Sequence, residues 1–319
     1  MPHPPRFLVA TPISHASGGF ITPVFLLGGT VYLEAGFDSE GFMRAIERQR
    51  IDTAFLVPTM ICTLLVHPQI RRIDLSGLET VLYAAAPMSP ARIAEALDIF
   101  AQVFMQGYGQ TESPCIFIVL RKQDHDTAHM ARLGSCGRPV AGGCVKILDD
   151  QLYEAPTGEI GEICIRSPQV MDGYWKQPQE TADAFRGGWL HTGYMARRDE
   201  EGCIYIVDRA KDMIISGAFN VFPREMEDVL AQHPAVSMST AIGVPDEKWE
   251  EQVKAIVVLR PEARVTAEEL IRLVCEKKGA VYTPKSVDFA ESLPVTALGK
   301  ADLKQLRTKY WQGEARQVH

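Results

Sequence analysis

Strands and helices alternate along the first 125 or so residues, and this alternation limits the fold more than any other feature. The apolar runs Thr30–Leu33 and Thr80–Tyr83 have the length and composition of buried strands. Ser89 followed by Pro90 is typical of a helix start, because serine caps free backbone amides and proline fixes the first φ. The helix would bury one apolar face, formed by Ile93, Ala96, Leu97 and Phe100. This pattern favours an α/β layer built on a parallel sheet.

Two regions with different patterns of predicted secondary structure follow. Between 132 and 208, short β-rich runs are broken by Gly, Pro and Asp turns, which predicts a small barrel or sandwich; the runs are Val145–Leu148, Glu162–Ile165 and Ile204–Val207. Beyond a charged boundary at Asp208–Asp212, Pro223 and the capping box Thr266–Glu269 each begin a helix, and Val253–Leu259 is a strand between them. We therefore expect a partial α/β subdomain over 1–131, a β-barrel-like subdomain over 132–208, and a C-terminal α+β domain over 209–319.

Composition excludes several classes of protein. The 319 residues are 46% hydrophobic and 23% charged, as in an ordinary globular protein, and the formal charge of −7 argues against nucleic acid as a partner. No apolar run approaches the ~20 residues that cross a bilayer. The seven cysteines form no C-x-x-C pair. They are typical of free thiols in a reducing cytoplasm and argue against a zinc cluster.

The segment Gln106–Glu112 carries the clearest chemical signal. Two glycines allow a tight turn that presents the ring of Tyr108, the hydroxyl of Thr111 and the carboxylate of Glu112 within five positions. The ring could stack on a base, the hydroxyl could bind a phosphate oxygen, and the carboxylate could hold Mg²⁺. These are parts of a nucleoside triphosphate site, although the same string alone is more often a plain loop.

Five further strings occur in order with this turn. They are Pro12–Gly18, Ala84–Ser89, Gly188–Gly193, the pair Asp208–Asp212 and Ser216–Pro223, and Leu293–Lys300. Together they resemble the adenylate-forming (ANL) superfamily, and within it the bacterial acyl-CoA synthetases or fatty-acid–CoA ligases. The resemblance implies a large adenylation domain followed by a mobile C-terminal lid domain. It implies that a fatty or aromatic carboxylate attacks ATP to give an acyl-adenylate, and that coenzyme A then displaces AMP.

The resemblance also implies roles for individual residues in the nucleotide site. The small-residue segment with Ala85, Ala86 and Pro87 would let the adenine lie close, and Tyr108 with Gly109 would cover it. Thr111 would hold phosphate, and Glu112 would hold Mg²⁺.

Other residues would serve the two half-reactions. Arg209 would bond the ribose, Lys300 would meet the α-phosphate, Lys211 would mark the hinge, and Gly217 would lie in the loop lining the pantetheine channel. His15 would gate the thiol channel. Taken singly, His15 is more often a structural hydrogen-bonding residue, Lys300 a solvated loop charge, and the Arg209–Asp212 segment a surface ion-pair cluster.

The chain departs from the superfamily pattern in several places. The Ser/Thr/Gly-rich phosphate loop of the superfamily lies upstream of the Pro12 string, and this chain begins eleven residues before that string. Tyr194 stands where an aspartate grips the ribose, Ala218 stands at a usual glycine, and so does Glu250. We expect either a ligase with impaired activity or a pseudoenzyme or scaffold that binds AMP, acyl-adenylate or a protein partner. Exposed sheet edges would favour self-association.

Overall fold

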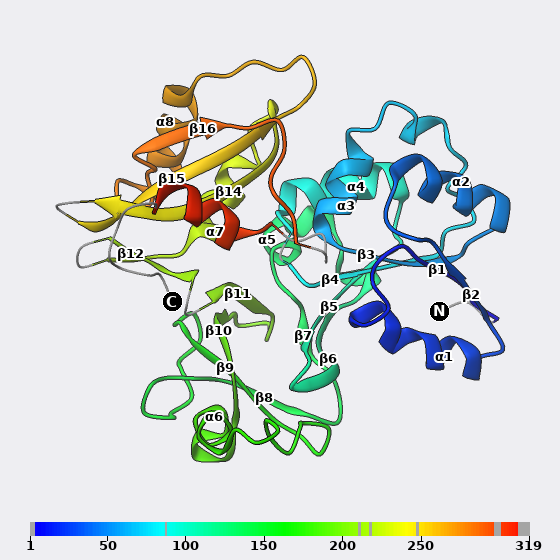
Figure 1. Ribbon diagram of the computed structural model, residues 1–319, viewed down its shortest axis with the longest axis horizontal. Helices are drawn as coiled ribbons and strands as arrows, with labels where there is room; N and C mark the ends of the chain where they lie inside the picture. Colours follow the sequence, from blue (N-terminus) through cyan, green and yellow to red (C-terminus); the bar gives the residue numbers. More distant parts are fainter. Residues whose placement is uncertain are drawn as a thin grey trace. The chain divides into compact units, whose positions relative to one another are not determined.

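The computed structural model describes residues 4–86, 88–209, 212–216, 219–246, 249–296 and 301–311. The chain divides into two compact units, Met1–Ile206 and Val207–His319 (Figure 1). The predicted boundaries at 131 and 208 remain predictions. Among the described residues, no helix has both the length and the apolar character needed to cross a bilayer.

The first unit contains a seven-stranded sheet with the order β2-β1-β3-β4-β5-β6-β7. The five strands from β1 to β5 run parallel, and β6 and β7 are antiparallel to their neighbours. The strands are β1 Arg6–Val9, β2 Thr30–Leu33, β3 Thr53–Leu56, β4 Thr80–Ala84, β5 Phe104–Gln110, β6 Ser113–Leu120 and β7 Arg138–Pro139. The predicted α/β layer with a parallel sheet is confirmed.

Helices lie on both sides of the parallel strands. In Figure 1, α2, α3 and α4 lie together on one side of the sheet and α1 lies on the other. This follows from right-handed crossovers, because β1 connects to β2 in one direction and the later strands progress in the other. The helices are α1 Ile21–Leu26, α2 Ser39–Gln49, α3 Pro58–Leu65, α4 Pro90–Phe100 and α5 Met130–Leu133, with short 3₁₀ turns at Ala16–Phe20, Ile70–Arg72, Lys122–Asp124 and Thr127–His129.

The local signals in this layer are mostly as the sequence indicates. The Ser89 hydroxyl accepts from the amide of Arg92, and Pro90 is the first residue of α4. Strand β4 is buried, as predicted, but β2 is wrongly predicted to be buried: it pairs only with β1, and Leu33 is 61% exposed. A short apolar run has the same appearance at the centre of a sheet and at its edge, so the sequence does not separate the two cases.

A second, four-stranded antiparallel sheet follows, with the order β11-β10-β9-β8. It corresponds to the predicted β-rich region. Its strands are β8 Cys144–Leu148, β9 Gly161–Arg166, β10 Leu190–Arg198 and β11 Ile204–Arg209, and the connection between β9 and β10 contains α6 Pro178–Ala184 and a 3₁₀ turn at Arg186–Gly188.

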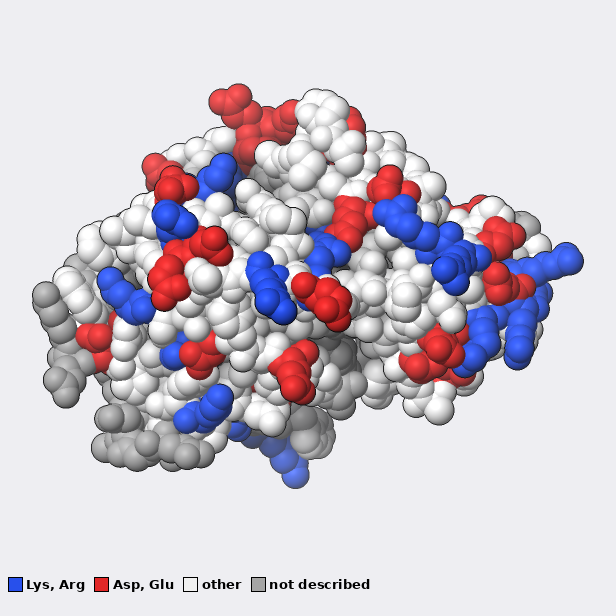
Figure 2. Space-filling view, turned by 90° about the horizontal axis from the view of Figure 1, so that it is seen from above, with Lys and Arg blue, Asp and Glu red and all other residues white. Residues whose placement is uncertain are grey.

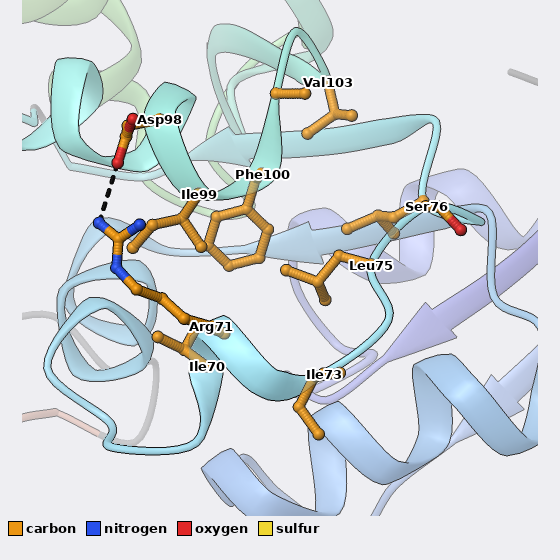
Figure 3. A pocket seen from close by; sticks show the side chains of 11 residues that line it. Ile70, Arg71, Ile73, Leu75, Ser76, Asp98, Ile99, Phe100 and Val103 are labelled. Carbon is orange, nitrogen blue, oxygen red and sulfur yellow. Dashed lines mark hydrogen bonds and ion pairs between the residues drawn. The ribbon is translucent and has the colours of Figure 1, made fainter.

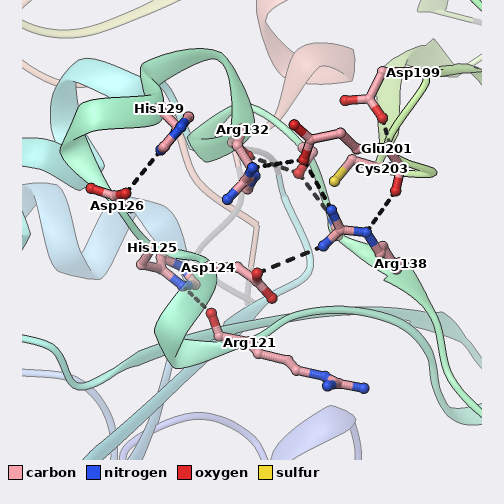
Figure 4. A network of polar contacts seen from close by, with 12 residues as sticks. Arg121, Asp124, His125, Asp126, His129, Arg132, Arg138, Asp199, Glu201 and Cys203 are labelled. Atoms are coloured by element: carbon pink, nitrogen blue, oxygen red, sulfur yellow. Dashed lines mark hydrogen bonds and ion pairs between the residues drawn. The ribbon is translucent and has the colours of Figure 1, made fainter.

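Ion pairs join the two sheets of the first unit. Glu201, in the turn between β10 and β11, accepts from Arg132 at 2.6 Å and from Arg138 at 3.1 Å (Figure 4). Arg138 also donates to the backbone oxygen of Glu201 and lies 3.6 Å from Asp124. The Cys136 amide donates to the oxygen of Ile204. These contacts fix the antiparallel sheet beside β6 and β7.

The second unit is an α+β structure. Its sheet has the order β13-β12-β15-β14, and β16 pairs with β15. The elements are β12 Ile214–Ser216, β13 Phe219–Val221, α7 Pro223–Leu230, β14 Val236–Asp246, β15 Glu250–Leu259, α8 Ala267–Lys278, β16 Ser286–Phe289 and α9 Leu303–Tyr310. Alternate residues of β15 face opposite sides of the sheet. Val253, Ala255 and Val257 pack with α7 and α8, while Ile256 and Val258 pack with α9.

Charged side chains of both signs lie on the described surface that Figure 2 draws. On the face drawn in Figure 2, acidic and basic side chains are interspersed, and neither sign gathers into a broad patch.

Candidate functional site

The topology of the parallel sheet brings three of the sequence strings to one edge. Residues 10–18 follow β1, Ala85 and Ala86 follow β4, and the Thr111–Glu112 turn follows β5. Parallel strands end at the same edge, and the register pairs Ala84, the last residue of β4, with Gly107, three residues before the end of β5. The chain turns from β2 back across β1 to β3, so the sheet order reverses here. Such a reversal at the carboxyl ends is where open α/β sheets bind ligands.

Backbone conformation shapes the segment after β4. Ala85 has φ +78°, a left-handed value that costs a residue with a Cβ roughly 1–2 kcal/mol. The segment is small and open, since Ala85 is exposed and Ala86 is partly exposed. Pro87, predicted to belong to the same small-residue segment beside the adenine, lies outside the described residues.

The turn after β5 presents polar groups of different accessibility. Thr111 and Gly109 are exposed. Glu112 is partly buried, and its Oε1 accepts from the hydroxyl of Tyr174 at 3.0 Å. Its backbone oxygen accepts from the amide of Met171. The carboxylate is therefore positioned by the connection that follows β9, and its hard oxygen atoms suit Mg²⁺.

Tyr108 is more buried than its predicted role, which is to cover the adenine, requires. Only 7% of the residue is exposed, and its ring meets Tyr194 edge-on with centroids 5.5 Å apart. Burial raises the pKa of its phenol, so the group stays neutral. Its hydroxyl has no hydrogen-bond partner among the described residues. Tyr108 thus contributes to the core shared by the two sheets, and little of its ring is accessible for stacking.

The segment carrying Tyr194 is held by a hydrogen-bonded turn on β10. Glu162 Oε1 accepts from the amide of Gly193 at 2.7 Å, and Gly193 has φ +73°. The Thr192 hydroxyl donates to the oxygen of Ile163 and accepts from the amide of Tyr194. This network orients Tyr194 toward Tyr108.

A cluster that the sequence did not indicate supports the same turn. His191 Nδ1 lies 2.6 Å from Glu162 Oε2 and 3.6 Å from Cys164 Sγ. Cys164 is fully buried, and burial followed by the nearby Glu162 charge raises the pKa of its thiol to about 12. The sequence signal that could have indicated this cluster is the spacing of Glu162 and Cys164, which are two positions apart on one strand and therefore lie on the same face.

His15 lies in the loop after β1. It is exposed, and its Nδ1 lies 2.8 Å from the hydroxyl of Ser14. The close approach of Gly18 to the Ile13 oxygen leaves no room for a Cβ, since one built there would lie 1.8 Å from that oxygen. The loop is therefore tightly folded around the histidine.

Several predicted residues cannot be placed. Lys211, Gly217, Ala218 and Lys300 lie outside the described residues, and only the backbone of Arg209, at the end of β11, is described. Val295 and Ala301 form a β-bridge, and the Asp302 amide donates to the Pro294 oxygen.

A hollow in the first unit lies at the opposite edge of the sheet. It has a volume of ≈ 350 Å³ and is lined by residues that precede β4 and β5 (Figure 3). Ile70, Ile99 and Phe100 form its apolar wall, and the Arg71–Asp98 ion pair of 2.9 Å lies at its rim. Because it faces the amino ends of the strands, it does not belong to the site at the carboxyl edge.

Comparison with known proteins agrees with this arrangement. The AMP-binding enzyme family matches residues 2–175, and the AMP-binding enzyme C-terminal domain matches 225–300. A medium/long-chain-fatty-acid–CoA ligase of Mycobacterium tuberculosis is 48% identical over 99% of this chain and 56% of its own length. A feruloyl-CoA synthase of Amycolatopsis is 40% identical over 96% of this chain and 62% of its own.

The solved structures include a similar fold along most of the chain. The amide bond synthetase McbA of Marinactinospora thermotolerans has a TM-score of 0.89 and 39% identity, covering 96% of this chain and 62% of that protein. The chain thus spans roughly three fifths of the length of these relatives. The match over more than half of its residues shows that the chain belongs to the AMP-binding enzyme family.

Proposed function

We propose that the chain takes part in ATP-dependent ligation of a carboxylic acid to coenzyme A. A carboxylate oxygen would attack the α-phosphorus of ATP and release pyrophosphate, and the thiol of coenzyme A would then displace AMP to form a thioester. The observation that carries the proposal is the convergence of the segments after β1, β4 and β5 at one carboxyl edge. Family membership and the names of the two ligase relatives support it.

We assign a separate role in nucleotide binding to each of several residues at this edge. Ala85 and Ala86 would border the adenine, with Pro87 beside them. Thr111 is exposed and would donate its hydroxyl hydrogen to a phosphate oxygen. Glu112 would hold Mg²⁺, which neutralises phosphate charge when bound. The reaction depends on positioning and on charge neutralisation rather than on a covalent catalyst.

The remaining roles rest on the superfamily resemblance. Arg209 would bond the ribose, and Lys300 would contact the α-phosphate during adenylation. Lys211 would act as the hinge about which the C-terminal unit turns between the half-reactions, and Gly217 would border the pantetheine. His15 would lie between the acyl pocket and the thiol channel, in keeping with its exposed position after β1.

The substrate we propose is a fatty or aromatic acid, because the relatives act on medium- and long-chain fatty acids and, by name, on ferulate. We assign the reaction to the cytoplasm. The cysteines whose side chains are described, Cys62, Cys136, Cys144, Cys164, Cys203 and Cys275, are all free thiols, which suits a reducing compartment.

The test separates the half-reactions. Purified chain is incubated with ATP, Mg²⁺, coenzyme A and a panel of fatty and aromatic acids, and AMP and acyl-CoA are measured by mass spectrometry. A second reaction supplies synthetic acyl-adenylate in place of ATP and acid. We expect Lys300→Ala to abolish product in the first reaction and to spare it in the second. Failure of well-folded chain in both reactions would refute ligase activity.

A second candidate is binding of AMP or acyl-adenylate, or of a protein partner, without adenylation. The placement of Tyr194 favours it, because this neutral phenol stands where the superfamily has an aspartate and packs against the buried Tyr108. Calorimetry with AMP distinguishes the two candidates. Binding of AMP without turnover of ATP would support the second.

We also propose self-association through the outer edge of the first sheet. Among the described strands, β2 pairs only with β1. Leu26 and Phe25 on neighbouring α1 are 82% and 60% exposed, so an apolar surface adjoins the unpaired edge. Light scattering should report a species larger than the monomer, and Leu26→Glu should shift it toward the monomer. A monodisperse monomeric wild type would exclude this.

A further inference from the structure

Three potential metal ligands converge on the face shared by β9 and β10. Glu162 and Cys164 are two positions apart on β9, so their side chains emerge on the same face. His191 on β10 is the direct antiparallel partner of Cys164. One donor atom from each residue lies within 4.8 Å of the others. No C-x-x-C spacing marks this group in the sequence, because His191 and Cys164 come together only through the pairing of β10 with β9.

The hydrogen bonds of His191 indicate which ring nitrogen would bind. Nε2 lies 3.1 Å from the backbone oxygen of Arg186, and a carbonyl oxygen only accepts, so Nε2 carries the hydrogen. A hydrogen bond from the outer ring nitrogen to a backbone carbonyl is the usual way in which a metal-binding histidine is oriented. Nδ1 then faces two further groups, Glu162 Oε2 at 2.6 Å and Cys164 Sγ at 3.6 Å.

A cation is needed between Nδ1 and the carboxylate, because two lone pairs would otherwise face each other at 2.6 Å. A proton satisfies this need and gives an imidazolium–carboxylate pair. A divalent metal ion satisfies it too, and engages the sulfur in addition. We propose that Glu162, Cys164 and His191 form a binding site for a divalent transition-metal ion of the zinc class.

The distances suit such an ion. Tetrahedral zinc with bonds of about 2.0–2.1 Å to nitrogen and about 2.3 Å to sulfur places these two ligands about 3.5 Å apart. The observed separation of Nδ1 and Sγ is 3.6 Å. The carboxylate must move outward from 2.6 Å to about 3.4 Å, which its side chain, 22% exposed, has room to do.

The three ligands determine which protons metal binding releases and which turn of the chain it would stiffen. Binding releases to solvent the thiol hydrogen of Cys164 and the proton between His191 and Glu162, and no electron is transferred. The ion would hold Glu162, whose other oxygen accepts from the Gly193 amide. It would therefore stiffen the turn that carries Tyr194.

The test uses cobalt as a spectroscopic substitute for zinc. The 319-residue chain is freed of metal with a chelator, dialysed and titrated with Co²⁺. We expect one ion per chain, a thiolate-to-cobalt charge-transfer band, and displacement of cobalt by one equivalent of Zn²⁺. Cys164→Ser should abolish the band and weaken zinc binding by at least about 100-fold. Cys144→Ser removes an exposed thiol from the neighbouring strand β8 and should change neither.

Two outcomes would overturn the site. One is a wild-type cobalt spectrum without the thiolate band, a result that needs no variant. The other is a band that survives in Cys164→Ser with unchanged affinity. If Cys164→Ser fails to fold by circular dichroism, Glu162→Gln replaces it as the variant. It should keep the thiolate band and lose about 10-fold in zinc affinity, and unchanged affinity would contradict the ligand set.

Discussion

Glu227 on α7 makes the stability of the C-terminal unit depend on pH. Its Oε1 accepts from the Thr240 hydroxyl at 3.0 Å and from the Ala241 amide at 2.9 Å. Burial, and next the nearby charge of Asp208, raise the pKa of Glu227 from 4.5 to about 7, against the favourable effects of the two hydrogen bonds and Arg224. The charged form of this carboxyl is therefore unfavourable in the folded unit.

The difference between the folded and unfolded pKa of Glu227 determines the sign and the magnitude of its effect on stability as the pH changes. The folded-state pKa lies above the unfolded value, so the contribution of Glu227 to stability is fully present below pH 4.5 and is lost as the pH rises through 7. A rise from 4.5 to about 7 corresponds to about 3 kcal/mol. The partial exposure of the residue lowers this to about 2 kcal/mol.

Glu227→Gln tests the reasoning, because glutamine keeps an oxygen for the Thr240 and Ala241 donors and has no charge to lose. We expect the stability of the variant relative to wild type to increase by about 2 kcal/mol between pH 5 and pH 8. Hydrogen exchange of the β14 amides, corrected for intrinsic rates at each pH, measures the local opening free energy. This local readout avoids assuming that the two units unfold together.

The matched control is Glu225→Gln on the same helix. Glu225 is partly exposed and pairs with Lys278 at 2.9 Å. Its removal should change the opening free energy by less than about 0.5 kcal/mol at any pH. An unaltered pH dependence in Glu227→Gln, or an equal change in both variants, would refute the assignment to Glu227.

Three further predictions concern single side chains. Tyr194→Asp should tighten AMP binding about 10- to 100-fold, because a charged acceptor adds about 1.5–3 kcal/mol per hydrogen bond; calorimetry measures this, and unchanged affinity would mean that the residue does not face the ribose. Thr266→Ala removes the capping-box acceptor of α8 and should cost about 1 kcal/mol in denaturant unfolding of the C-terminal unit, whereas Thr266→Ser should cost little. Burial lowers the pKa of His125 below 6.5, so its contribution to stability is present above pH 6.5 and is lost as the pH falls through the folded-state value; His125→Asn should flatten this acid-side slope in pH-dependent melts.

The sequence predicted the elements whose signals are local. Ser89 and Pro90 begin α4, the Thr266–Glu269 capping box begins α8, and Pro223 begins α7. These signals involve a few neighbouring residues and short-range hydrogen bonds, so they do not depend on the rest of the chain. The pattern of apolar runs, turn residues and helix signals along the chain likewise indicated an α/β layer, a β-rich region and an α+β region in that order.

Burial and accessibility were less predictable. Thr30–Leu33 forms an edge strand rather than a buried one, and Tyr108 lies in a core although it follows a glycine in a turn-like string. Each outcome depends on which segments pack against the residue. Those segments are distant in sequence: Tyr194, which covers Tyr108, belongs to a strand of the second sheet.

The sequence by itself determined the family, the order of the segments and the residue types available to the candidate site. Only the tertiary structure decided which of them meet. The parallel strands bring the segments that follow β4 and β5 to the same edge of the sheet, and the pairing of β9 with β10 brings His191 opposite Cys164. The physical reason is that strand register is fixed by hydrogen bonds between segments far apart in the chain, and no local pattern specifies that pairing.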